Sequence, residues 1–150
     1  MPEEVYRTKF ELRAVPDTLV IHCSDPTFQA HFQEFLHDHL KLESYALLAV
    51  PGGPQFLTLT DYLPKYAWVG WRWTKFLFDV ANPARVVLIA HEECRWYEDS
   101  RFAHLGLGDR AHKHLDLARV SQELRSRFPN LHVDAYLARL DSGHVVFEKD

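Results

Sequence analysis

The chain has 150 residues, of which 47% are hydrophobic, 25% are charged and 13% are aromatic, and its net charge at pH 7 is −4. This length suits one domain with a full hydrophobic core, and the aromatic content excludes a chain that is disordered throughout. The acidic balance argues against a general nucleic-acid-binding protein, and no apolar run approaches the roughly 18 residues that span a bilayer. We expect one domain over residues 1–150, with residues 1–16 as an N-terminal lead-in or arm.

The cellular setting is inferred from the cysteines and the N-terminus. Two cysteines are too few for the disulfide framework of a small secreted protein. The charged N-terminal segment contains no apolar stretch of the kind found in signal peptides. We therefore expect a cytoplasmic protein. Its ten histidines favour a metal site or proton-transfer chemistry.

The hydrophobic pattern predicts strands and helices that alternate along the chain. Unbroken apolar and β-branched runs are typical of strands buried on both faces, whereas apolar residues spaced three and four apart are typical of amphipathic helices. In chain order, the expected elements are a strand (17–23), a helix (26–40), a strand (44–50), a helix (72–81), a strand (85–91), a helix (109–128) and two strands (132–139 and 145–148). Residues 55–71 are rich in aromatic residues and are expected to be irregular, and residues 99–108 are expected to form a loop.

Local signals set the boundaries of these elements. Asp25 and Pro26 suit the cap and the first position of a helix, and Asn82-Pro83 suits a helix end. Asp109 suits the cap of the last helix, whose expected core-facing residues are Ala111, Leu115, Ala118 and Leu124. Asp141-Ser142-Gly143 is typical of a hairpin turn. The order of elements predicts an α/β fold: a mainly parallel sheet of about four strands with flanking helices and a C-terminal antiparallel hairpin strand.

Three candidate metal ligands lie where two of the expected strands end. Cys23 ends the first strand, His91 ends the third, and Cys94 follows shortly after. Parallel sheets bind ligands at the carboxyl ends of their strands, and two thiolates with one imidazole suit zinc. We therefore expect a Zn²⁺ site formed by these three residues, with a fourth position left for water, an anion or another side chain. Two buried core thiols, or a disulfide between them, are the alternative interpretations.

The residues around these ligands resemble the β-class carbonic anhydrases. That family carries a C-x-D-x-R motif and an H-x-x-C motif. Cys23-Ser24-Asp25 matches the first motif except for its arginine, and His91-Glu92-Glu93-Cys94 matches the second in full. Residues 49–53 look like its glycine-bearing loop, and residues 136–146 are similar to its closing hairpin. The resemblance implies that Cys23, His91 and Cys94 hold zinc, and that zinc-bound hydroxide hydrates carbon dioxide reversibly to bicarbonate. It also implies a homodimer or a multiple of one; neither a membrane nor a nucleic acid is an expected partner.

Two departures from the family pattern concern the same carboxylate. The motif arginine falls at Thr27, and the glycine that usually follows the second cysteine is Arg95. The resemblance implies that the arginine pairs with the aspartate and keeps it off the metal. Without that partner, Asp25 is either the gate that controls the open metal position or the fourth metal ligand. A role only as the cap of the following helix would account for an aspartate at this position equally well. Arg95 could reach Asp25 instead, and Gly52, Gly53 and Arg95 are expected to line the substrate cleft.

Two kinds of function are compatible with this site. The first is a zinc-binding, carbonic anhydrase-like lyase whose activity is weak or lost, because an unpaired carboxylate binds the metal or disfavours a bound hydroxide. The second is a non-catalytic zinc-binding or regulatory module with Asp25 as a permanent fourth ligand. Hydrolysis of another small heterocumulene on the same scaffold is a further alternative.

Other reactive or aromatic residues are assigned structural roles. His22 faces away from Cys23 on its strand, and the histidine pairs at 37 and 39 and at 112 and 114 cannot share a helix face. Glu92 and Glu93 are expected to be solvated loop charges rather than proton acceptors. An aromatic stripe is expected to form core or subunit interface rather than a ligand platform; it consists of Tyr62, Tyr66, Trp68, Trp71 and Trp73.

Overall fold

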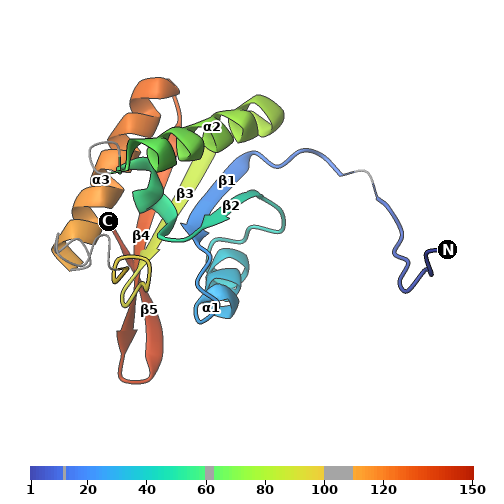
Figure 1. The fold of residues 1–150 in the computed structure, drawn as a ribbon, viewed down its shortest axis with the longest axis horizontal. Coiled ribbons are helices and arrows are strands. Elements are labelled where there is room, and N and C mark those ends of the chain that lie inside the picture. The colour runs from blue at the N-terminus through green and yellow to red at the C-terminus, as the bar shows by residue number, and fades with distance from the viewer. Residues whose placement is uncertain (12, 60–62, 100–109) are drawn as a thin grey trace.

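The fold is known from a computed structural model that describes residues 1–11, 13–59, 63–99 and 110–150. Its strands are β1 (Thr18–Cys23), β2 (Ala46–Val50), β3 (Arg85–His91), β4 (His132–Asp141) and β5 (His144–Lys149). Its helices are α1 (Gln29–Glu34), the π-helix η1 (Phe35–His39), the 3-10 helix η2 (Gly53–Leu57), α2 (Pro64–Ala81) and α3 (Arg110–Arg127) (Figure 1).

The strands form one sheet in the order β2-β1-β3-β4-β5. The pairs β1–β2, β1–β3 and β3–β4 are parallel, and β5 runs antiparallel to β4. The turn between β4 and β5 places Ser142 and Gly143 at φ values of 49° and 81°, a left-handed conformation that glycine adopts without steric cost. The expected α/β fold with a mainly parallel sheet and a C-terminal hairpin strand is confirmed.

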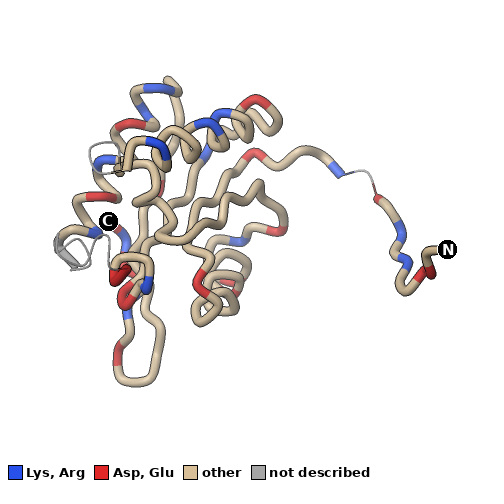
Figure 2. The backbone as a smooth tube through the Cα atoms, viewed as in Figure 1, with Lys and Arg blue, Asp and Glu red and all other residues tan. Residues whose placement is uncertain are grey.

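Helices cover both faces of the sheet. Residues Leu19 and Ile21 of β1 join the core that contains buried side chains of α2 and α3. Val20, which points to the opposite face, joins the core formed with α1 and η1. Figure 2 shows the Lys, Arg, Asp and Glu residues mainly on helices and connections, with few on the inner strands. The unbroken apolar runs of β1 and β3 therefore reflect burial on both faces, as predicted.

Helix α2 begins at Pro64, so the expectation that residues 55–71 are irregular is wrong for residues 64–71, and residues 55–57 belong to the 3-10 helix η2. The buried stripe of α2 consists of Ala67, Gly70, Thr74 and Phe78. Small residues thus face the core, and several large aromatic residues face outward, which hides the helical periodicity in the sequence. The close packing is visible at Gly70, where a Cβ atom would lie 2.4 Å from the ring of Phe56 in η2.

Two further helix expectations need correction. The helix expected over residues 26–40 begins at Gln29 and continues as the π-helix η1. In α3, Leu115 and Ala118 are exposed instead of facing the core. Two charged residues, Lys113 and Asp116, lie on the buried face of α3, so that face does not show as an apolar stripe in the sequence. The described buried side chains of α3 are Lys113, Asp116, Leu117, Val120, Ser121 and Leu124. Tyr62, residues 100–109 with the cap expected at Asp109, and the side chain of Ala111 lie outside the described part of the chain.

The N-terminal segment precedes β1 without regular structure. In residues 1–11 and 13–16 there is no helix or strand, and Figure 1 shows this segment leading away from the sheet. It exposes the apolar side chains of Val5, Tyr6, Phe10 and Val15. Among the described helices, none is both long enough and apolar enough to cross a membrane.

Candidate metal centre

Cys23, His91 and Cys94 come together at the carboxyl end of the sheet. Cys23 ends β1 and His91 ends β3, and these two strands are paired neighbours. Cys94 follows β3 after a reversal of the chain in which Glu93 adopts a left-handed φ of 52°. One ligand atom from each of the three residues lies within 4.8 Å of the others, and all three side chains are buried. The fold therefore brings together the three residues that were predicted from the strand ends.

The orientation of His91 suits a metal ligand. Its Nδ1 lies 2.7 Å from the carbonyl oxygen of Glu92, so Nδ1 carries the proton and Nε2 keeps its lone pair. The ring of Phe28 lies against the imidazole, with centroids 4.2 Å apart. In the described part of the chain, the buried Nε2 has no hydrogen-bond partner. An unsatisfied buried acceptor is costly, and a metal ion held with the two sulfur atoms would satisfy it.

The two thiols form a hydrogen-bonded pair. Their sulfur atoms are 3.7 Å apart, and both cysteines are free. The hydrogen bond from Cys94 lowers the pKa of the Cys23 thiol, against the opposing effect of burial. The same pairing and burial raise the pKa of Cys94. The pair thus favours a thiolate at Cys23, and a divalent metal would favour loss of the second proton.

Asp25 lies beside this centre but outside the group of three. Its Oδ1 accepts a hydrogen bond from the backbone N–H of Thr27 at 2.9 Å, in the turn that leads to α1. Its own N–H lies 3.4 Å from the sulfur of Cys23. Burial raises the pKa of Asp25, but the Thr27 hydrogen bond, with smaller contributions from His91 and Arg95, lowers it overall. The carboxylate is therefore charged and held by a cap-type contact.

A cleft of about 270 Å³ opens beside the centre. The described residues that line it are Cys23, Ser24, Asp25, Pro26, Pro51, Arg95, Trp96 and Asp99. Arg95 thus lies where a cleft residue was expected. Gly52 and Gly53, which were also expected to line the cleft, are buried and are not among its lining residues. A Cβ at Gly52 would come within 2.3 Å of the Trp96 indole, and one at Gly53 within 2.7 Å of the backbone nitrogen of Cys23. Only glycine permits these close approaches.

The remaining candidates occupy mainly structural positions. His22 is buried, and its ring packs against Phe32 with centroids 4.7 Å apart. Glu92 accepts a hydrogen bond from the backbone of Leu140, and Glu93 is exposed. His37 and His114 contact Asp38 and Asp150, respectively. In the aromatic stripe, Trp71 packs on the core and bonds to the Leu57 carbonyl, whereas Trp68 and Trp73 are 64% and 46% exposed.

The sequence alone did not indicate three buried polar residues near the metal centre, Gln55, Tyr97 and Asp116. Tyr97 packs in one cluster with Cys23 and Cys94, and its hydroxyl contacts Asp116, which also binds Gln55. A signal for Asp116 was present, because it precedes Val120 and Leu124 at intervals of four on the buried face of α3. A charged residue in an apolar helical stripe indicates a buried partner.

Solved structures match this fold, although no protein-family model and no curated protein matches the sequence. A carbonic anhydrase from Streptococcus mutans has a TM-score of 0.57 and 13% identity, over 95% of this chain and 87% of that chain. A β-carbonic anhydrase from Trichomonas vaginalis has a TM-score of 0.52 and 13% identity, over 95% and 87%. A β-carbonic anhydrase from Sordaria macrospora, described as tetrameric, has a TM-score of 0.50 and 12% identity, over 90% and 81%. The chain therefore has the β-carbonic anhydrase fold that its motifs predicted.

Proposed function

We propose that the protein is a zinc-binding, β-carbonic anhydrase-like enzyme that hydrates carbon dioxide reversibly to bicarbonate. The observation that supports this proposal is the buried group of Cys23, His91 and Cys94, in which the imidazole Nε2 lacks a partner among the described residues. When bound there, zinc supplies a Lewis acid that lowers the pKa of a coordinated water. Three protein ligands would leave one coordination position for water, and Cys23 also lines the cleft that opens beside the group.

In this proposal, Asp25 controls the open position. Thr27 holds its carboxylate through a backbone N–H, but Thr27 has no guanidinium with which to pair. Arg95 attracts Asp25 from the same cleft, although its exposure to solvent weakens the attraction. An incompletely paired carboxylate disfavours a further negative charge beside a centre whose two thiolates already neutralise the metal. We therefore expect weak hydration activity near neutral pH that rises as the pH increases.

The competing proposal is a non-catalytic zinc module in which Asp25 is the fourth ligand. It is supported by the position of Asp25, whose backbone N–H contacts the Cys23 sulfur and whose side chain lines the same cleft. A closed site of four protein ligands is typical of structural zinc. Such a module would bind zinc and show no hydration of carbon dioxide at any pH.

One experiment separates these proposals. Zinc content is measured in the purified protein, and carbon dioxide hydration is followed by stopped-flow spectroscopy from neutral to alkaline pH, with Cys23→Ser as the metal-free control. About one zinc per chain with hydration that rises with pH supports the enzyme. Zinc without hydration supports the closed module. A protein that binds no zinc contradicts both.

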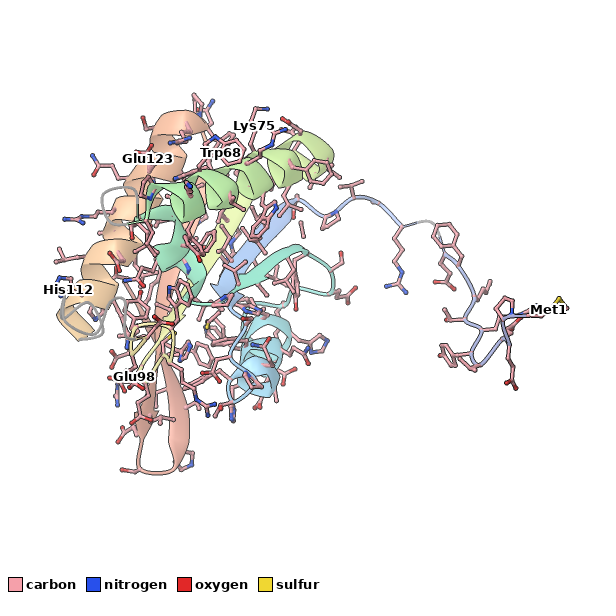
Figure 3. All side chains as sticks on the ribbon, in the orientation of Figure 1. Met1, Trp68, Lys75, Glu98, His112 and Glu123 are labelled. Atoms are coloured by element: carbon pink, nitrogen blue, oxygen red, sulfur yellow. The ribbon has the colours of Figure 1, made fainter. Side chains whose placement is uncertain are left out.

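We extend the proposal to a homodimer, or a multiple of one, in the cytoplasm. The support for assembly is an apolar patch on α2, formed by Trp68, Trp73, Phe76 and Val80, which are all exposed. Figure 3 labels Trp68 on this helix, and it also labels Met1 at the far end of the N-terminal segment. Exposed apolar patches of this kind mark subunit interfaces, which in homo-oligomers are symmetric. Two adjacent free thiols suit a reducing compartment.

A further inference from the structure

Asp116 is a buried carboxylate held by side chains from other segments. It lies on α3 and is 6% exposed. Its Oδ2 accepts hydrogen bonds from the amide of Gln55 at 2.9 Å and from the hydroxyl of Tyr97 at 3.3 Å. The hydroxyl of Thr58 lies 3.3 Å from its Oδ1. One carboxylate therefore joins α3, η2 and the turn that follows β3.

Tyr97 connects this carboxylate to the metal centre. Its side chain is 4% exposed and packs in the same buried cluster as Cys23 and Cys94. Its backbone N–H donates to the carbonyl of Cys94 at 3.1 Å. Burial, followed by the charge of Asp116, raises the pKa of Tyr97, so its hydroxyl stays protonated and acts as the donor. The Asp116 carboxylate is thus separated from the two thiols by a single side chain.

Among the described residues, neutral side chains rather than a salt bridge hold the buried carboxylate of Asp116. The three described side chains that contact its oxygens are neutral, and burial raises the pKa of Asp116 in spite of their hydrogen bonds and a smaller attraction from the charge of Arg119. By contrast, the buried carboxylate of Asp134 contacts the charged groups of Arg85 and Lys149. Asp134 lies on β4 opposite Val87, away from the carboxyl end of the strands. A buried carboxylate with neutral donors is more costly than an apolar residue of the same size, which favours a role in the neighbouring site.

We propose that Asp116 is a positioning residue of the metal centre, which acts through Tyr97 to fix the turn that carries Cys94. This inference rests on the proposed binding of zinc by Cys23, His91 and Cys94. Some side chains do not bind the metal themselves but hold its ligands in the right orientation. Replacing such a side chain typically lowers metal affinity by about 10- to 100-fold. Asp116 and Tyr97 form one chain of contacts, so their effects on metal binding are not additive.

The test measures metal binding rather than catalysis. Zn²⁺ affinity is determined by competition with a chelator, and Co²⁺ is used as a spectroscopic probe of ligand geometry, in the parent, Asp116→Asn, Tyr97→Phe and the double variant. Tyr97→Phe removes only the hydroxyl and keeps the ring against the two cysteines. Each single variant is expected to lose about 10- to 100-fold in Zn²⁺ affinity and to change the Co²⁺ absorption spectrum. The double variant is expected to lose no more than the larger single effect.

Asp134→Asn is the matched control, because it also removes a buried carboxylate. It is expected to lower stability while leaving Zn²⁺ affinity and the Co²⁺ spectrum unchanged. If the parent binds Zn²⁺ but Asp116→Asn and Tyr97→Phe bind it equally well, the positioning role is wrong and the proposed function is unaffected. If the parent itself binds no Zn²⁺, the proposed metal centre fails, and the role of Asp116 fails with it. Should Asp116→Asn not fold, Tyr97→Phe alone decides between these outcomes.

Discussion

The sulfur atoms of Cys23 and Cys94 lie 3.7 Å apart although 71 residues separate them in the chain. Replacing Cys23 with serine is expected to abolish stoichiometric zinc binding and to lower the unfolding temperature in the presence of zinc, because metal-binding energy stabilises only the folded chain. Metal analysis and thermal unfolding with and without zinc measure both effects. Ser24→Ala, at the exposed neighbouring position, is the control. A parent whose unfolding temperature does not respond to zinc would contradict the prediction.

Thr27→Arg is expected to increase carbon dioxide hydration. The new guanidinium would lie two residues beyond Asp25 and could form a bidentate pair with its carboxylate, which keeps the fourth metal position open. The nearby helix start opposes a cation by only a few tenths of a kcal/mol. Stopped-flow hydration assays across pH compare the variant with the parent and with Thr27→Gln, which adds length without charge. If the parent is already a fast enzyme, Arg95 or a neighbouring subunit must supply the missing cation.

Gly52→Ala is expected to destabilise the protein more than Gly143→Ala does. Both glycines have φ near 80°, but a Cβ at Gly52 would lie 2.3 Å from the Trp96 indole, whereas one at Gly143 meets nothing within 4 Å. The left-handed backbone alone costs about 1–2 kcal/mol at either position. Overpacking against Trp96 adds about 1–3 kcal/mol at Gly52. Urea unfolding measures the difference, and equal losses would show that Trp96 moves without cost.

Asp134→Asn is expected to reduce stability at neutral pH by about 2 kcal/mol. Burial tends to raise the pKa of Asp134, but Lys149 and Arg85 lower it overall. The folded-state pKa therefore lies below the unfolded value of about 3.9, so the stabilisation is present above that value and is lost as the pH falls through the folded-state pKa.

The measurement for Asp134→Asn is urea unfolding at neutral pH and at pH values below about 4. The variant is expected to lose less stability on acidification than the parent does. Asp79→Asn is the control, since Asp79 pairs with Lys75 on the exposed face of α2 and such pairs contribute at most about 1 kcal/mol. Parallel pH profiles for the parent and Asp134→Asn would contradict the assignment.

Phe76→Glu is expected to convert a dimeric parent to monomers. Phe76 is 63% exposed within the apolar patch of α2, and a carboxylate buried in an interface is strongly unfavourable. Leu115→Glu tests a similarly exposed apolar residue on α3, which is 52% exposed, and should leave the dimer intact. Light scattering at micromolar concentration gives the mass of each protein. A monomeric parent would refute the assembly and would leave the α2 patch without a partner.

The strands, and the grouping of Cys23, His91 and Cys94, could be predicted from the sequence because their signals are local. After Thr18 in β1 and Arg85 in β3, each strand is apolar up to its histidine, and a parallel sheet brings the carboxyl ends of the two strands to one edge. The start of α2 could not be predicted, because Ala67 and Gly70 form its buried face while larger residues point outward. The role of Asp116 was also hidden, since its partners come from segments distant in the sequence.

The strand order also determines when the metal centre forms during folding. Among the described residues there are four strand pairings, and only that of β4 with β5 joins neighbouring segments through a tight turn. The pairing of β1 with β3 closes a long loop. Closing it costs conformational entropy of the chain, which is lost before the contacts between the two strands can offset the cost. Cys23 and His91 meet only after that step. The chain must therefore close this loop and pair β1 with β3 before the two residues can share a metal ion, so zinc would bind to a sheet that has already begun to form.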